Sequence, residues 1–126
     1  MPIFKLLLIA AGGAVGTLAR YGTSSALIRV TERTGFPFGT LAVNLIGCFV
    51  IGYLNGLFLE RLSIRPEYRL MLIVGFLGGY TTFSSFAWES ASLLRDKQYV
   101  PALANLLVSN VLGVVLVLVG YGLGRR

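Results

Sequence analysis

The chain of 126 residues has no histidine and only one cysteine, Cys48. A structural zinc site needs several Cys or His ligands, which this chain does not have. A Ser or Cys nucleophile usually needs a neighbouring histidine as its base, and the chain has none. A single cysteine also cannot form a disulfide within the chain. Neither a Walker-type phosphate loop nor a dinucleotide fingerprint occurs in the sequence. We therefore expect neither an enzyme nor a nucleotide-driven pump.

Charge is scarce as well, because Asp, Glu, Lys and Arg make up 13% of the residues and hydrophobic residues make up 56%. The mean hydropathy of +0.79 is typical of a membrane protein. A membrane span needs about 20 mostly apolar residues. We predict an all-α membrane protein, with one four-helix transmembrane domain over residues 1–126 and spans near 3–28, 38–60, 68–94 and 99–123. The amino end lacks a clear cleavage site, which disfavours a secretory signal.

Cations are divided almost evenly between the two predicted sides of the membrane. Six belong to the side of the two termini and four to the other side: Lys5, Arg61, Arg65, Arg69, Arg125 and Arg126, against Arg29, Arg33, Arg95 and Lys97. Orientation follows an excess of Lys and Arg, so this distribution permits either one orientation or both, and hence an antiparallel homodimer. The net charge of +6 suits contact with membrane lipids. No basic stripe lies on a soluble face, so nucleic acid is not an expected partner.

Glycines recur at a spacing of four residues in each predicted span. The pairs are Gly12 with Gly16, Gly52 with Gly56, Gly75 with Gly79 and Gly120 with Gly124. Small residues at this spacing allow two helix backbones to approach closely in lipid. The pattern predicts a compact bundle whose helices also meet a partner subunit, with the function residing in a dimer.

The segment at residues 75–86, GFLGGYTTFSSF, interrupts an otherwise apolar span. Each of its three glycines lowers helix stability by roughly 1 kcal/mol relative to Ala, and Thr81 and Thr82 can bond nearby backbone with their hydroxyls. We predict that the third helix is broken in the middle of the membrane. Broken backbone is tolerated there only when it is buried in protein or lines a wet cavity, so this break is a candidate ion site.

Polar residues also lie on the predicted second and fourth spans. Asn44 shares a helix face with Thr40, and its amide could either hold helices together or donate a hydrogen bond to a passing anion. Asn105, Ser109 and Gly113 repeat every four residues and form a polar track on an apolar helix.

Two ionisable residues lie within predicted spans. Arg20 could extend to the membrane interface or set a positive potential at a vestibule. Glu89 is the only carboxylate well inside a span, where a charge must be paired or hydrated. It could cap hydroxyls across a subunit interface, pair with an arginine, or carry protons.

Phe83 and Phe86 lie three residues apart, just beyond the predicted break. Core packing is the commoner role of such rings. The edge of a phenyl ring is electropositive, however, so an anion can pass along it without being held too firmly.

Three motifs give the chain a resemblance to a known family, the Fluc or CrcB-type fluoride channels. They are GGAVGTLARY at 12–21, FGTLAVNLIGCFVIG at 38–52 and GFLGGYTTFSSF at 75–86. The resemblance implies four-helix subunits of the bacterial inner membrane, assembled as an antiparallel dual-topology homodimer. It also implies two fluoride pores along the dimer interface and a structural sodium ion at the centre, near the third-helix breaks.

The same resemblance assigns roles to individual residues. The pore would be lined by the phenyl pair Phe83 and Phe86, the Asn44 amide, and the polar-track residues Ser109 and Asn105. Arg20 would belong to the electropositive vestibule, and Gly78 and Thr81 would offer backbone carbonyls to sodium. Some members carry Tyr and Ser along the last helix where this chain has Asn105 and Gly113.

The expected mechanism is passive, selective efflux of fluoride. A small proton-coupled multidrug exporter is an alternative of the same size, but it needs a carboxylate in the first span, and this first span has none. A non-transporting membrane assembly subunit would explain the glycine pairs and the loop cations. It would leave the Gly, Thr and Phe residues at the break unexplained.

Overall fold

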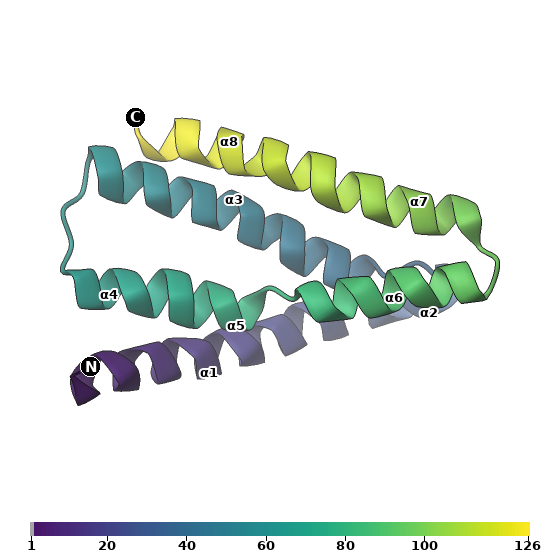
Figure 1. Cartoon of the computed structure of the whole chain (residues 1–126), viewed down its shortest axis with the longest axis horizontal. Coiled ribbons are helices and arrows are strands. Elements are labelled where there is room, and N and C mark those ends of the chain that lie inside the picture. Colours follow the sequence, from purple (N-terminus) through teal and green to yellow (C-terminus); the bar gives the residue numbers. More distant parts are fainter. Residues whose placement is uncertain (1) are drawn as a thin grey trace.

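The structure is a computed structural model that describes residues 2–126, in which the regular elements are helices (Figure 1). Two of these elements, η1 and η2, are π-helical. In chain order they are α1 (Ile3–Ala26), α2 (Ile28–Thr34), α3 (Phe38–Glu60), α4 (Pro66–Leu70), η1 (Met71–Leu77), α5 (Gly78–Tyr80), α6 (Phe83–Arg95), α7 (Tyr99–Leu107), η2 (Val108–Leu112) and α8 (Gly113–Gly124).

Among residues 2–126, four long helices are apolar enough to cross a membrane, which confirms the prediction of an all-α chain with four such helices. They are Ile3–Ala26, Phe38–Glu60, Pro66–Arg95 and Tyr99–Gly124. The third long helix comprises α4, η1, α5 and α6, and the fourth comprises α7, η2 and α8. Both ends of the chain lie at the same end of the molecule (Figure 1).

The helices associate chiefly in two pairs, because α1 packs along η1 and α5, and α3 packs along α8. Glycines make both contacts close. A Cβ atom added to Gly79 would lie 2.5 Å from the Gly13 carbonyl oxygen, and one added to Gly56 would lie 2.5 Å from that of Tyr121. The four predicted glycine pairs thus lie at contacts between helices within this chain, where a side chain would separate the backbones.

Two glycines of α8 give a matched test of this packing. A methyl group on Gly120 would collide with the Phe49 carbonyl, whereas a methyl group on Gly122 would meet no atom within 4 Å. We expect Gly120→Ala to lower the free energy of unfolding by about 1–3 kcal/mol. Gly122→Ala should be neutral or slightly stabilising, since Ala is the better helix former. Thermal unfolding of both variants in detergent would check this, and equal stability would contradict it.

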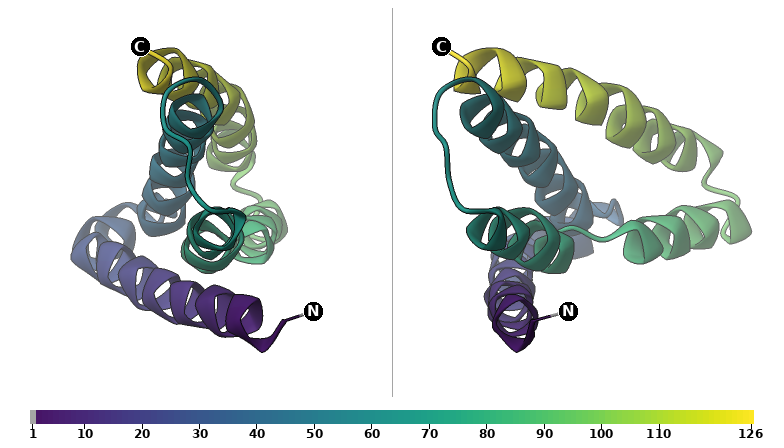
Figure 2. Two further views of the ribbon diagram at one scale, coloured as in Figure 1. Left: turned by 90° about the vertical axis from the view of Figure 1, so that its left-hand side faces the viewer. Right: turned by 60° about the vertical axis from the view of Figure 1, so that its left-hand side comes forward.

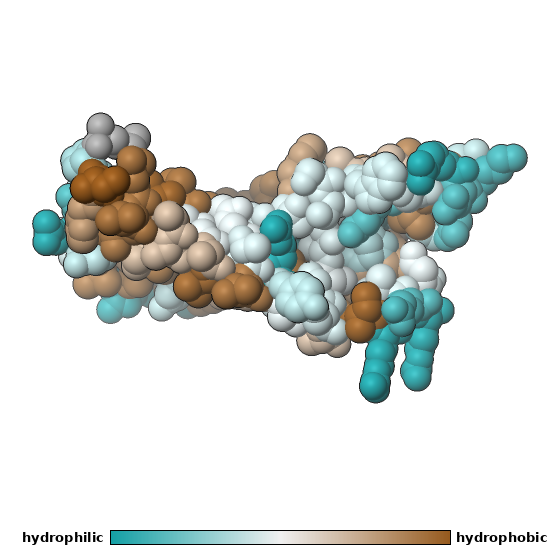
Figure 3. Space-filling model, turned by 90° about the horizontal axis from the view of Figure 1, so that it is seen from below, coloured by the Kyte–Doolittle hydropathy of each residue, from teal (hydrophilic) through white to brown (hydrophobic). Residues whose placement is uncertain are grey.

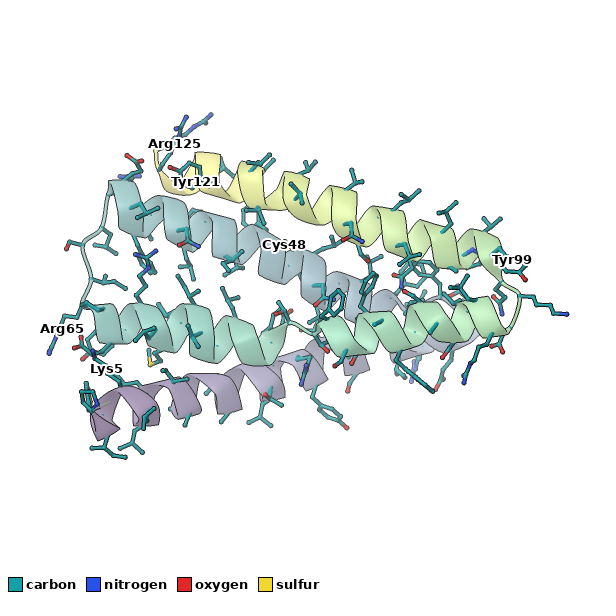
Figure 4. The ribbon with its side chains drawn as sticks, in the orientation of Figure 1. Lys5, Cys48, Arg65, Tyr99, Tyr121 and Arg125 are labelled. Carbon is teal, nitrogen blue, oxygen red and sulfur yellow. The ribbon has the colours of Figure 1, made fainter. Side chains whose placement is uncertain are left out.

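Charged groups gather at the ends of the molecule. Lys5, Arg65 and Arg125 lie at one end, and Tyr99, which follows the charged residues Arg95, Asp96 and Lys97 in the chain, lies at the other (Figure 4). On the face seen in Figure 3, strongly apolar residues dominate the half where α1 begins, and hydrophilic residues gather at the opposite end. This arrangement agrees with loops in water and helices in lipid.

The chain buries few large side chains. Only six hydrophobic residues among those described are buried: Val43, Leu77, Tyr80, Phe86, Leu93 and Ala102. The helices diverge toward one side of the molecule, where α6 and α7 extend away from α3 (Figure 2). Most apolar surface is therefore left for lipid or for another protein chain.

Candidate functional site

The third long helix is interrupted at Thr81 and Thr82 (Figure 1). Thr81 has φ −88° and ψ 158°, and Thr82 has φ −149° and ψ 117°, so both are extended. The glycines Gly75, Gly78 and Gly79 precede the interruption and are themselves helical. Two of them, Gly75 and Gly79, contact the α1 backbone closely, so close packing accounts for these two.

Side chains replace the helical hydrogen bonds at this interruption. In a continuous helix the Thr82 N–H would donate to the Gly78 carbonyl, and the Ser85 N–H would donate to the Thr81 carbonyl. Here the Thr82 N–H donates to Asn44 Oδ1 at 2.8 Å, and the Ser85 N–H donates to Thr82 Oγ1 at 3.3 Å. The carbonyls of Gly78 and Thr81 are thereby released from the helix.

Asn44 makes a second bond at the same place, since its Nδ2 donates to the Thr82 carbonyl at 2.9 Å. Arg20 reaches the break from α1, and its Nη1 donates to the Thr81 carbonyl at 3.4 Å. Close by, the hydroxyls of Thr23 and Tyr80 are hydrogen-bonded to each other at 3.1 Å. Both α1 and α3 therefore hold the interrupted segment.

A cavity of about 360 Å³ lies between α3 and the third long helix. It is lined by Asn44, Gly47, Cys48, Ile51, Ile73, Leu77, Gly78, Thr81, Thr82 and Phe83. Cys48 lies midway along α3 (Figure 4) and lines the cavity, and its Sγ would lie 3.3 Å from a Cβ atom added to Gly113 of α8. The cavity brings together four of the predicted site residues, namely Asn44, Gly78, Thr81 and Phe83.

The two phenylalanines differ in their surroundings. Their ring centroids are 5.7 Å apart, with the ring planes tilted by 53°. Phe83 is 77% exposed, whereas Phe86 is 8% exposed and packs inside the subunit. The Phe83 ring is therefore turned outward, and the Phe86 ring packs behind it.

The predicted polar-track residues lie apart from the cavity. Asn105 is 1% exposed, and its Nδ2 donates to Ser90 Oγ at 2.9 Å. The Ser109 hydroxyl donates to Asn105 Oδ1 at 3.4 Å. Sequence reasoning did not single out Ser90, although it lies four residues after Phe86 on the buried face of α6. A role of Asn105 and Ser109 in the pore stays a prediction.

Glu89 bonds within its own subunit. The Thr40 hydroxyl donates to Glu89 Oε1 at 2.7 Å, which joins α3 to α6. Glu89 Oε2 is buried and has no hydrogen-bond partner among residues 2–126. The Thr40 hydroxyl thus caps this carboxylate between two helices of one chain. A cap across a subunit interface, one of the three alternatives for Glu89, stays a prediction.

The comparisons with known proteins agree with each other. The family model described as "CrcB-like protein, Camphor Resistance (CrcB)" matches residues 7–121. A protein of Solibacter usitatus named "Fluoride-specific ion channel FluC" is 51% identical over 124 residues, which cover 97% of this chain and 99% of the relative. Proteins with the same name from Chlorobium phaeobacteroides and Maridesulfovibrio salexigens are 48% and 44% identical, over 95% and 96% of this chain and 92% and 95% of the relatives.

Proposed function

Since the chain belongs to the CrcB-like protein family, we propose that it is a channel through which fluoride leaves the cytoplasm passively. It is a multi-pass bacterial membrane protein, and the relatives named for fluoride-specific conduction match almost its whole length. Such a channel needs no energy source, because the ion moves down its own gradient. The family is one of ion channels rather than of enzymes.

The observation that carries the proposal is the joint exposure of Phe83 and Asn44 at the cavity beside the interruption. Asn44 uses one Nδ2 hydrogen for the Thr82 carbonyl, so the second remains available to an anion. The edge of the Phe83 ring offers a weaker positive potential nearby. A channel requires this combination, because the ion must bind firmly enough to enter and weakly enough to leave.

We further propose that two copies assemble as an antiparallel homodimer with two fluoride pores along the contact. An outward-facing Phe83 supports this, because a second subunit would enclose the ring that one subunit leaves 77% exposed. The division of loop cations, six against four, leaves both orientations open. Arg20 would provide positive potential at the vestibule, and Phe86, Asn105 and Ser109 would continue the pore.

A sodium ion would be held by the carbonyls of Gly78 and Thr81 from each subunit. Both oxygens are released from the helix by side-chain hydrogen bonds, and released carbonyls at helix breaks are ligands of the kind that bind Na⁺. The Thr81 carbonyl accepts only a long bond from Arg20 and keeps a second lone pair. These residues therefore fit the ion, which would supply a fixed positive charge and join the two breaks.

Gly78 and Gly79 offer a matched pair of substitutions that tests this site. A methyl group on Gly78 would enter the cavity without meeting any atom of the subunit within 4 Å, whereas one on Gly79 would meet the Gly13 carbonyl. We expect Gly78→Ala to abolish the rise in thermal stability that sodium produces, with the subunit fold retained. Gly79→Ala should lower stability with or without sodium. An unchanged sodium effect in Gly78→Ala would contradict the site.

Fluoride efflux from liposomes tests the proposed function directly. Purified protein would be reconstituted with fluoride inside, a potassium ionophore would carry the balancing charge, and a fluoride electrode would record release. We expect rapid release of fluoride and negligible release of chloride from a matched chloride-loaded sample. A folded protein that releases neither ion would overturn the proposal. It would then favour a multidrug exporter or an assembly subunit.

A further inference from the structure

We infer that Asn44 is also a positioning residue, whose side chain holds the third long helix open at Thr82. The inference deepens the proposed function and rests on it, because the released Gly78 carbonyl matters only as a ligand of the proposed sodium ion. It concerns the backbone of the interruption rather than the anion, so the two roles of Asn44 can be measured separately.

The geometry of the contact is a two-point clamp. Asn44 Oδ1 accepts from the Thr82 N–H at 2.8 Å, and Asn44 Nδ2 donates to the Thr82 carbonyl at 2.9 Å. One side chain on α3 therefore satisfies both backbone polar groups of a residue 38 positions further along the chain. The backbone N–H can only donate, so it must face Oδ1, which fixes the orientation of the amide.

Without this clamp, the Thr82 N–H can return to the carbonyl that would accept from it in a continuous helix. That carbonyl belongs to Gly78. An unpaired N–H in an apolar environment costs several kcal/mol, so loss of the Asn44 oxygen favours closure of the helix onto Gly78. Closure would withdraw the Gly78 oxygen from any other ligand.

Two other side chains assist at the same place but cannot replace Asn44. Thr82 Oγ1 accepts from the Ser85 N–H at 3.3 Å and so caps the first turn of α6. Arg20 donates to the Thr81 carbonyl at 3.4 Å. Neither contact satisfies the Thr82 N–H, whose acceptor is Asn44 Oδ1.

Three variants test the clamp in the full chain. Asn44→Leu removes both hydrogen bonds, whereas Asn44→Asp keeps an oxygen for the Thr82 N–H and loses only the bond to the Thr82 carbonyl. Asn110→Leu is the matched control, because the Asn110 amide is exposed and donates only to the Leu106 carbonyl of its own helix. The ¹³C chemical shifts of Thr82 Cα and Cβ, measured by NMR on threonine-labelled protein, report whether this residue is extended or helical. Thermal unfolding with and without sodium reports on the cation.

We expect extended shifts at Thr82 in the wild-type protein, in Asn44→Asp and in Asn110→Leu. Asn44→Leu should shift Thr82 to helical values and lose the sodium-dependent rise in thermal stability. Asn44→Ala removes the same two bonds with a smaller side chain and replaces Asn44→Leu if the latter does not assemble. If Thr82 stays extended in these variants, Asn44 does not hold the break and the inference is wrong.

Failure of this inference about Asn44 can be told apart from failure of the proposed function. Absence of fluoride efflux from the wild-type protein would overturn the channel but would leave the shifts of Thr82 unaffected. Absence of any sodium effect in the wild-type protein would overturn the cation site. The backbone shifts would still decide whether Asn44 is the clamp.

Discussion

Replacement of Phe83 by Ile should reduce fluoride efflux from liposomes at least about 100-fold, which corresponds to about 2.7 kcal/mol in the barrier. The physical reason is electrostatic. Ile fills a similar space but has no ring, so the electropositive edge that would stabilise the anion in the pore is lost. Fluoride release, measured with an electrode at equal protein density in the liposomes, checks the prediction.

The substitution should spare the fold. Phe83 is 77% exposed in the subunit, and its ring contacts the better-buried Phe86 at a centroid distance of 5.7 Å. Phe4→Ile provides the matched control, because Phe4 is 49% exposed at the start of α1, away from the cavity. We expect normal efflux from Phe4→Ile. Normal efflux from Phe83→Ile as well would exclude Phe83 from the pore.

Asn44→Asp should abolish fluoride efflux with the protein still assembled. A carboxylate in place of the amide removes the Nδ2 donors and, when ionised, repels the anion. The remaining oxygen can still accept from the Thr82 N–H, so the interruption in the third long helix is expected to persist. Liposome efflux combined with size-exclusion chromatography in detergent checks both parts of the prediction.

Asn55→Asp is the control for the added charge. Asn55 lies on the same helix, and its Oδ1 accepts from Arg69 Nη2 at 3.0 Å, so a carboxylate there gains a cationic partner. We expect efflux close to normal from this variant. Equal loss of efflux in both variants would show that any new carboxylate on α3 is harmful and would remove the support for Asn44 as a pore residue.

The four long helices were predictable from the sequence because the bilayer imposes a local requirement. Each span must be a run of about 20 apolar residues whose backbone bonds are satisfied within the helix. The family resemblance, predicted from three motifs, is confirmed by relatives up to 51% identical over nearly the whole chain. The antiparallel dimer, the pore residues and the sodium ion stay predictions.

The interruption was predictable in its region but not in its detail. Glycine propensity pointed to Gly75, Gly78 and Gly79, yet these residues are helical and the extended residues are Thr81 and Thr82. Packing against α1 explains Gly75 and Gly79. The close contact between the two helix backbones outweighs the low helix propensity of glycine. Such a contact depends on a neighbouring helix, which a local pattern does not contain.

The partners of the polar residues required the folded structure. Composition and periodicity placed Asn44, Arg20 and Glu89 on apolar helices. Their partners are Thr82, Thr81 and Thr40, which lie 38, 61 and 49 residues away in the chain. Hydropathy is a property of each segment, so the spans could be read from the residues in order. A hydrogen bond between helices depends on their relative position and rotation, and here that geometry determines which carbonyls are released and which side chains line the cavity.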